Sequence, residues 1–231
     1  MPFISPDDGY LTVFNLFDTD TRDKQDGLLD AMRDIIDNAA YPGWISSTLH
    51  SGQDRLGTAN YVQWRSREEL EERYAGERFK NETIPLFKSL STSVRLIKTE
   101  VVHTQSHPSL GGAVEIGPAR DDYTVITVFG VAPENQKALV DVLAHRDEHV
   151  LTLPGYRSHS ILRGVDGTYV VNYAQWDDRR SYERFHTLPE DERPADARRL
   201  RAEGRSLMTS RWSNTYQVVH SRSAATAGTE S

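Results

Sequence analysis

VVNYAQW at residues 170–176 repeats TANYVQW at residues 58–64, so the chain carries one motif twice, 112 residues apart. Pro42-Gly43 recurs as Pro154-Gly155 at the same spacing. Elsewhere the spacing drifts by a few residues, as expected when loops gain or lose residues at little energetic cost. We therefore expect a tandem duplication of a whole domain of about 100 residues, a common domain size.

Each copy has the pattern strand, helix, two strands, one or two helices, strand. Runs rich in β-branched and aromatic residues favour strands, and apolar residues at helical spacing favour helices. Strands are expected at 10–17, 44–50, 58–64 and 93–102 in the first copy, and at 123–131, 156–162, 168–176 and 211–220 in the second. Helices are expected at 24–38 and 66–74, after Pro133, and near 178–186 and 195–206.

This order predicts an α+β fold made of two tandem ferredoxin-like domains. Helices on one face of an antiparallel sheet leave the other face without a partner, and the sheet of the other copy is the obvious one. We expect the two antiparallel sheets to pack as an intrachain dimeric α+β barrel. The expected boundaries are 1–103 for the first domain, 104–121 for a linker, 122–221 for the second domain and 222–231 for a disordered tail.

Composition excludes several classes of function. The formal net charge is −7, whereas nucleic-acid binding needs a basic face. No apolar run approaches the roughly 20 residues of a membrane span, and the first residues lack the features of a secretory signal. The absence of cysteine excludes disulfides, thiolate catalysis and cysteine-ligated metals. We expect a soluble, cytoplasmic protein that binds neither nucleic acid nor membrane.

Alternation along the repeated strand assigns its residues to two faces. Asn172, Ala174 and Trp176 point one way, and Tyr173 and Gln175 point the other. If the first face lies beneath the helices, an amide and an indole share a space with only a methyl group between them. Such a space has room for a flat molecule.

A tryptophan on a strand is most often part of a core, and a strand asparagine often bonds to a neighbouring loop. Two observations favour a ligand instead. The first copy repeats the pair as Asn60 and Trp64 although much of the surrounding sequence has diverged. A buried asparagine without a partner also costs about 1–3 kcal/mol, so each copy needs something to satisfy it.

At these residues the chain resembles the antibiotic biosynthesis monooxygenases, over residues 10–104 and 122–221. The enzymes of that family are α+β barrels that oxidise aromatic polyketides without metal, flavin or haem. The resemblance implies a cofactor-independent monooxygenase of antibiotic or pigment biosynthesis. Its substrate would be a polycyclic aromatic small molecule, an anthrone or phenol oxidised to a quinone, with O2 as co-substrate.

The resemblance also implies site residues. In the second copy the catalytic positions fall on Asn172, Trp176, Tyr182 and Arg205, and Thr127 stands where some members carry a substrate-binding asparagine. In the first copy the catalytic positions fall on Asn60 and Trp64, and the substrate-binding positions on Asn15, His50 and Lys88.

Neither copy carries every family position. The first copy has Leu70 where the family tyrosine is expected and Lys88 where the arginine is expected. The second has Leu162 in place of the family histidine. We expect two pockets, and the second matches the family better because its tyrosine and arginine are both present.

The chemistry accounts for these residue types. Triplet O2 reacts poorly with a closed-shell phenol, but an anthrone carbanion or phenolate gives up an electron readily. The guanidinium of Arg205 would stabilise charge on the substrate oxygen. Asn172 would donate to that oxygen, Trp176 would stack on the polycycle, and Tyr182 would protonate a peroxy intermediate.

Other constellations are weaker. His145 and His149 lie one helical turn apart, like two metal ligands, but lack the glutamate of the zinc-protease motif and a third ligand. The haem-degrading branch of the fold uses a helical histidine, for which His186 is the candidate. GGAVEIG at residues 111–117 lies in the expected linker rather than after a strand, so dinucleotide binding is not supported. We expect no metal and no bound cofactor.

Two alternative functions stay open. A polyketide cyclase on the same fold needs the same flat pocket without oxygen chemistry, and a non-catalytic binding or scaffold paralogue would keep only the fold. The sequence names neither the polyketide nor the oxidised carbon. It also leaves open a homodimer of these intrachain pseudo-dimers.

Overall fold

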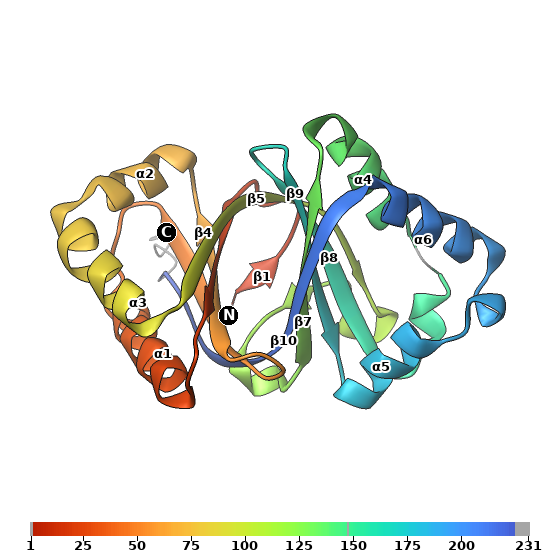
Figure 1. Ribbon diagram of the computed structural model, residues 1–231, viewed down its shortest axis with the longest axis horizontal. Helices are drawn as coiled ribbons and strands as arrows, with labels where there is room; N and C mark the ends of the chain where they lie inside the picture. Colours follow the sequence, from red (N-terminus) through yellow and green to blue (C-terminus); the bar gives the residue numbers. More distant parts are fainter. Residues whose placement is uncertain (1, 147, 225–231) are drawn as a thin grey trace, which may run out of the picture.

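The computed structural model describes residues 2–146 and 148–224. Two βαββαβ units lie side by side, with a closed barrel of strands between them and helices on both outer sides (Figure 1). The first unit contains β2 (Leu11–Asp18), α1 (Arg22–Asp37), β3 (Trp44–Gly52), β4 (Gly57–Trp64), α2 (Arg67–Ala75), α3 (Ile84–Leu90) and β5 (Ser93–Ser106). The second contains β7 (Tyr123–Val131), α4 (Gln136–Leu143), β8 (Tyr156–Gly164), β9 (Tyr169–Trp176), α5 (Arg179–Thr187), α6 (Ala195–Leu207) and β10 (Met208–Ser223).

The barrel order β10-β3-β4-β2-β5-β8-β9-β7 places each unit's strands in the ferredoxin-like arrangement. The predicted α+β fold, two tandem ferredoxin-like domains forming one intrachain barrel, is confirmed. In the part of the chain that the structure describes, no helix combines the length and apolarity that crossing a membrane requires.

The barrel closes because the last strand of each unit is long enough to belong to both sheets. β5 pairs with β2 through Glu100 and with β8 from Thr99 onward. β10 pairs with β7 as far as Tyr216 and continues along β3 to Ser223. The expected strands 93–102 and 211–220 were therefore too short, since the extra residues pair with the other unit.

The expected tail 222–231 begins inside this strand. Arg222 and Ser223 belong to β10, where Arg222 donates to the carbonyls of Ile36 and Ala39 at 2.6 and 2.8 Å and lies over the ring of Trp44. A disordered tail at 222–223 is therefore wrong, and residues 225–231 lie outside the described residues.

The expected linker 104–121 contains more structure than predicted. Residues 104–106 complete β5, and β6 (Val114–Glu115) pairs with β1 (Phe3–Ile4) in a small separate sheet. The glutamine of each repeated motif holds one of these strands: Gln63 donates to the carbonyl of Phe3 and Gln175 to that of Glu115, both at 3.0 Å. β6 is thus the second copy of β1, so this part of the linker belongs to the repeat.

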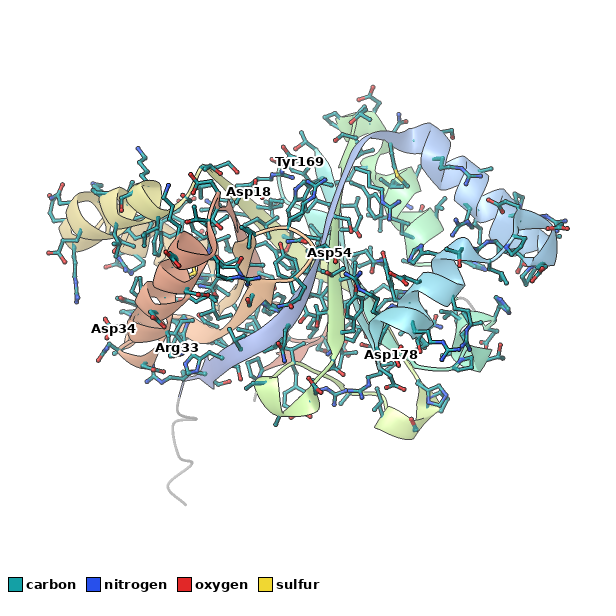
Figure 2. The ribbon with its side chains drawn as sticks, turned by 60° about the horizontal axis from the view of Figure 1, so that its bottom comes forward. Asp18, Arg33, Asp34, Asp54, Tyr169 and Asp178 are labelled. Carbon is teal, nitrogen blue, oxygen red and sulfur yellow. The ribbon has the colours of Figure 1, made fainter. Side chains whose placement is uncertain are left out.

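The β3–β4 turn also joins the units. Asp54 on this turn lies over the barrel strands, on the side toward α5 (Figure 2), and forms an ion pair with Arg179 at the start of that helix. Next to it, the side chain of Asn214 on β10 accepts from the backbone N–H of Arg55 at 3.0 Å and donates to its carbonyl at 3.1 Å. These contacts add to the strand pairing that joins the two units.

The barrel interior holds aromatic and aliphatic side chains. The motif tyrosines Tyr61 and Tyr173 are fully buried there, as are Phe14 and Tyr216. His50 is also fully buried and contacts the carbonyls of Thr48 and Ala59 through Nδ1, at 3.1 Å each. Since carbonyls only accept, Nδ1 carries the proton and the hydroxyl of Tyr173 donates to Nε2 at 2.8 Å.

Burial lowers the pKa of His50 to about 4, so the unfolded chain binds more protons than the folded chain between pH 6.5 and 4. Stability contributed by neutral His50 is therefore lost as the pH falls through this window. We expect the unfolding free energy to fall between pH 7 and 4.5 by about 2 kcal/mol more in the unmodified protein than in His50→Leu. Leucine is the residue at the equivalent position 162, and urea unfolding at both pH values measures the difference. An equal fall in the unfolding free energy of the two proteins would contradict the lowered pKa of His50.

Candidate functional site

The helix-facing side of the second sheet carries the motif residues in register. Asn172 lies opposite Thr127 of β7, which in turn lies opposite Ser213 of β10. The hydroxyls of Thr127 and Ser213 are 3.0 Å apart. Further along β9, Ala174 and Trp176 share this face, while Tyr173 points into the barrel. The predicted division of the motif between two faces is confirmed.

A cavity of about 360 Å³ lies between this sheet face and α4, α5 and α6. Asn172, Ala174 and Trp176 line it from the sheet, and Tyr182 and Arg205 line it from the helices. Thr127 is also among its lining residues. All five residues proposed for the second copy (Asn172, Trp176, Tyr182, Arg205 and Thr127) therefore border one space.

Sequence differences between the copies explain why this space is open. α4 has 8 residues, whereas α1 has 16 and buries Met32 and Ile36 in its second half. Ala174 replaces Val62, which removes two methyl groups from the floor. Tyr182 replaces Leu70, which is fully buried against Trp64 in the first unit.

Two buried polar atoms of the cavity floor are unpaired. Asn172 Oδ1 and Trp176 Nε1 have no hydrogen-bond partner in residues 2–146 and 148–224. Each such atom costs about 1–3 kcal/mol when it is left without a partner. One is an acceptor and the other is a donor, so together they are suited to a ligand that carries a hydroxyl and a carbonyl.

Aromatic rings surround Trp176 on several sides. Phe185 stacks on it with ring centroids 5.5 Å apart, and Tyr156 and Tyr182 meet it edge-on at 5.5 and 6.0 Å. Burial raises the pKa of Tyr182, so its phenol is protonated and able to donate at neutral pH. The walls at this end suit a flat aromatic ligand.

Arginines surround the helical side of the cavity. Arg205, 59% exposed, binds Glu190 at 3.2 Å, and Arg193 donates to the carbonyls of Phe185 and Leu188. Arg211 of β10 forms no ion pair or hydrogen bond within the described chain. Its positive charge favours the ionised form of Tyr182 and the neutral form of His186. His186 lies against the Tyr182 ring, 4.3 Å between centroids. A positive potential at this end favours an anionic ligand group.

The sheet side also carries a histidine that the sequence did not single out. His159 of β8 lies opposite Ala174, lines the cavity, and contacts the hydroxyl of Tyr156 through Nδ1 at 2.9 Å. The Tyr156 hydroxyl donates to the carbonyl of Gln105, also at 2.9 Å. Burial and the neighbouring His103 lower the pKa of His159 to about 4, so its imidazole is neutral at neutral pH.

A β-bulge hid His159 from the sequence pattern. The register between β8 and β9 shifts between Tyr156 and Ser158, so His159 and Ile161 share the face of Tyr156. Strict alternation from Tyr156 would place His159 on the opposite face. Arg211 is the first residue of the expected strand 211–220, whereas β10 already begins at Met208, and its place in the cavity lining follows only from the packing of the helices over this strand.

The first unit brings fewer of its predicted residues together. Asn15 lies opposite Asn60 on one face, and Asn60 Oδ1 is buried without a partner among the described residues. Trp64 packs in an apolar cluster with Trp44 and Leu70. Lys88 is exposed on α3, away from Phe87 and Leu90, which face α1.

The assignment of His50 to the same pocket as Asn60 is wrong. The β3 register shifts between Trp44 and Ser46, and this bulge turns His50 into the barrel. Asn60 points to the helices, so the two side chains lie on opposite faces of the sheet.

His145 and His149 both line the cavity of the second unit. Nevertheless, no three His, Asp or Glu side chains of the described residues come together in a way that could hold a metal ion.

Comparison with known proteins gives three findings. The family model for antibiotic biosynthesis monooxygenase matches residues 122–191. The tetracenomycin-F1 monooxygenase of Streptomyces glaucescens is 40% identical over 75 residues, which are 32% of this chain and 67% of that protein. The crystal structure of an anthrone oxidase-like protein is 45% identical with a TM-score of 0.92, covering 97% of both chains.

A more distant structure shares the fold alone. A putative monooxygenase of Fusobacterium nucleatum is 13% identical, with a TM-score of 0.59 over 93% of this chain and 94% of that one.

Filling the cavity floor should weaken binding of a flat anionic probe. Ala174→Val restores the two methyl groups present at Val62, and we expect it to lower the affinity for 8-anilinonaphthalene-1-sulfonate about tenfold, or ~1.4 kcal/mol. Fluorescence titration measures this affinity. Val62→Ala is the matched change in the first unit and should leave it within twofold. An unchanged affinity in Ala174→Val would mean that the probe binds elsewhere.

Proposed function

The chain belongs to the antibiotic biosynthesis monooxygenase family, and we propose that it is a cofactor-independent monooxygenase that oxidises an aromatic polyketide with O2. The reaction converts an anthrone or a phenol to a quinone. The observation that carries this proposal is the second-unit cavity, whose aromatic walls enclose an unpaired buried acceptor and an unpaired buried donor.

The substrate itself supplies the electrons. Deprotonation of an anthrone methylene gives an enolate, which transfers one electron to O2, and the resulting substrate radical and superoxide combine to a peroxide anion that takes up a proton to become a hydroperoxide. Loss of water from the hydroperoxide leaves the new carbonyl, so one oxygen atom enters the quinone and the other leaves as water. The protein's contribution is to make and hold the anion, and no metal, flavin or haem takes part in the balance.

The polar groups of the cavity suit an aromatic ketone with a neighbouring hydroxyl. Asn172 Oδ1 accepts from the hydroxyl, and Trp176 Nε1 donates to the oxygen on which the negative charge develops. Such a donor in a site that excludes water is worth several kcal/mol in the transition state. The unpaired Oδ1 of Asn172 can accept a hydrogen bond from the substrate, and the amide nitrogen of the same side chain can still donate one.

Helical residues serve the later steps. Tyr182 is protonated before the reaction and donates its proton to the distal oxygen of the peroxide anion, and water returns a proton to its phenolate afterwards. Arg205 at the cavity edge, paired with Glu190, adds positive potential for the anion. Thr127 lies opposite Asn172 on the neighbouring strand, and its hydroxyl, 3.0 Å from that of Ser213, is a further polar group for contact with substrate.

Oxidation is assigned to the second unit, because the first lacks the tyrosine and encloses Trp64 with Leu70 and Trp44. The proposal includes a cytoplasmic location and association of two chains, each already a pseudo-dimer. Sedimentation velocity measures that association. The polyketide cyclase remains the alternative, since its substrate has the same flat shape.

Purified protein without added cofactor should consume O2 in the presence of 1,8-dihydroxyanthrone and release the quinone, with a rate unchanged by EDTA. Asn172→Ala and Trp176→Phe each remove one of the unpaired polar atoms, and we expect kcat/KM to fall about 10- to 100-fold. An oxygen electrode and absorbance of the quinone give the rates.

Asn60→Ala is the matched variant of the first unit. A larger loss from Asn172→Ala assigns oxidation to the cavity of the second unit, whereas a larger loss from Asn60→Ala would assign it to the first unit. Tight binding of the anthrone without O2 uptake would reject the monooxygenase and favour the cyclase or a binding protein.

A further inference from the structure

The proposed oxidation begins with loss of a proton, and none of the residues assigned so far takes one. Asn172 and Trp176 do not ionise in the neutral range, and Arg205 carries its proton permanently. Burial keeps Tyr182 protonated. The cavity therefore requires a further group with a free lone pair at neutral pH.

His159 lies where such a group is needed. It is the cross-strand neighbour of Ala174, the small residue that opens the cavity floor, and so lies between the rows of Asn172 and Trp176. The equivalent residue of the first unit is Ser47, whose hydroxyl accepts from Trp44 Nε1 at 3.0 Å. The histidine is thus specific to the unit that has the open cavity.

Hydrogen bonding fixes which ring nitrogen is basic. A carbonyl only accepts, so the single Tyr156 hydroxyl proton goes to the Gln105 oxygen, at 2.9 Å. The Tyr156 oxygen then accepts from Nδ1–H of His159, also at 2.9 Å. This leaves the lone pair on Nε2, as a general base requires.

We propose that His159 is the general base of this site and that it takes the proton from the substrate carbon or hydroxyl that is oxidised. This inference rests on the proposed function. In the anthrone case the methylene C–H bond breaks, the proton moves to Nε2, and the electron pair remains on the substrate as the enolate. The enolate is then the one-electron donor to O2, and water accepts the proton from the imidazolium after turnover.

The environment of His159 agrees with this role. A pKa of about 4 keeps the imidazole neutral before substrate binds. An enolate formed beside the ring has the opposite charge to the imidazolium and raises that pKa, so the proton transfer becomes more favourable as it proceeds.

The dimensions suit a polycycle. Arg211 on β10 lies opposite Phe129, and His159 on β8 lies in the row of Val125, so the two residues are separated by about 13 Å along the strands and by three strand spacings, or about 14 Å, across the sheet. Both side chains line the cavity, so a substrate of three or four fused rings with its acidic C–H at His159 can extend an anionic substituent toward the long side chain of Arg211.

Proton abstraction can be measured apart from oxidation. We expect the protein to catalyse exchange of the methylene protons of 1,8-dihydroxyanthrone with D2O under anaerobic conditions, followed by NMR. His159→Gln should lower this exchange about 100-fold, within the range for loss of a general base. The affinity for 1,8-dihydroxyanthrone, measured by quenching of tryptophan fluorescence, should stay within threefold. Tyr156→Phe leaves the base in place but removes its hydrogen-bond partner, and should reduce exchange about tenfold at unchanged affinity.

Two further measurements guard against a misfolded variant. Added imidazole should restore exchange to His159→Ala, and His107→Gln, a change at a histidine between the two units that does not line the cavity, should leave exchange within twofold. Exchange by His159→Gln at the unmodified rate would overturn the proposal, as would O2-dependent oxidation by a protein that catalyses no exchange above background. Exchange without any O2 uptake would retain the base and reject the monooxygenase.

Discussion

The hydrogen-bonding edge of each four-stranded sheet is the constraint on which the rest of the structure depends. An exposed edge invites pairing with another chain, and closing a barrel removes it. Here β5 and β10 are long enough to cover the edge of the opposite sheet, so the barrel closes within one chain. With the inner faces buried around Tyr61 and Tyr173, the outer faces are left for the helices, and any ligand site must form there.

Duplication then allows the two units to diverge. Both units contribute strands to one barrel, so a unit that loses packing on its outer face still packs against the other unit through the barrel. The first unit fills its outer face with a long α1, Val62 and Leu70, and the second opens the same space with a short α4, Ala174 and Tyr182. A cavity in one half is tolerated because the other half retains a packed core.

Sequence periodicity predicted those features that depend on regular strands. β9 has no bulge against β7, so alternation correctly placed Asn172 and Trp176 beneath the helices and Tyr173 in the barrel. It failed for His50 and His159, because bulges in β3 and β8 shift the alternation by one residue, and nothing in either segment marks the bulge. The crossings of β5 and β10 were also missed, since their partners lie in the other copy. The role of Gln63 and Gln175 as anchors of β1 and β6 follows only from the three-dimensional contact.

The chemical character of the cavity follows from the same geometry. Strand registry places an acceptor, a donor and a neutral imidazole in adjacent rows of one face, and the helices cover them with apolar rings. In such an environment a hydrogen bond to a developing anion is stronger than in water, and the fixed dipoles need no reorganisation when the charge appears. A site of this kind lowers the free energy of the substrate anion more than that of the neutral substrate. For a molecule whose anion is itself reactive toward O2, that difference is sufficient to start the oxidation.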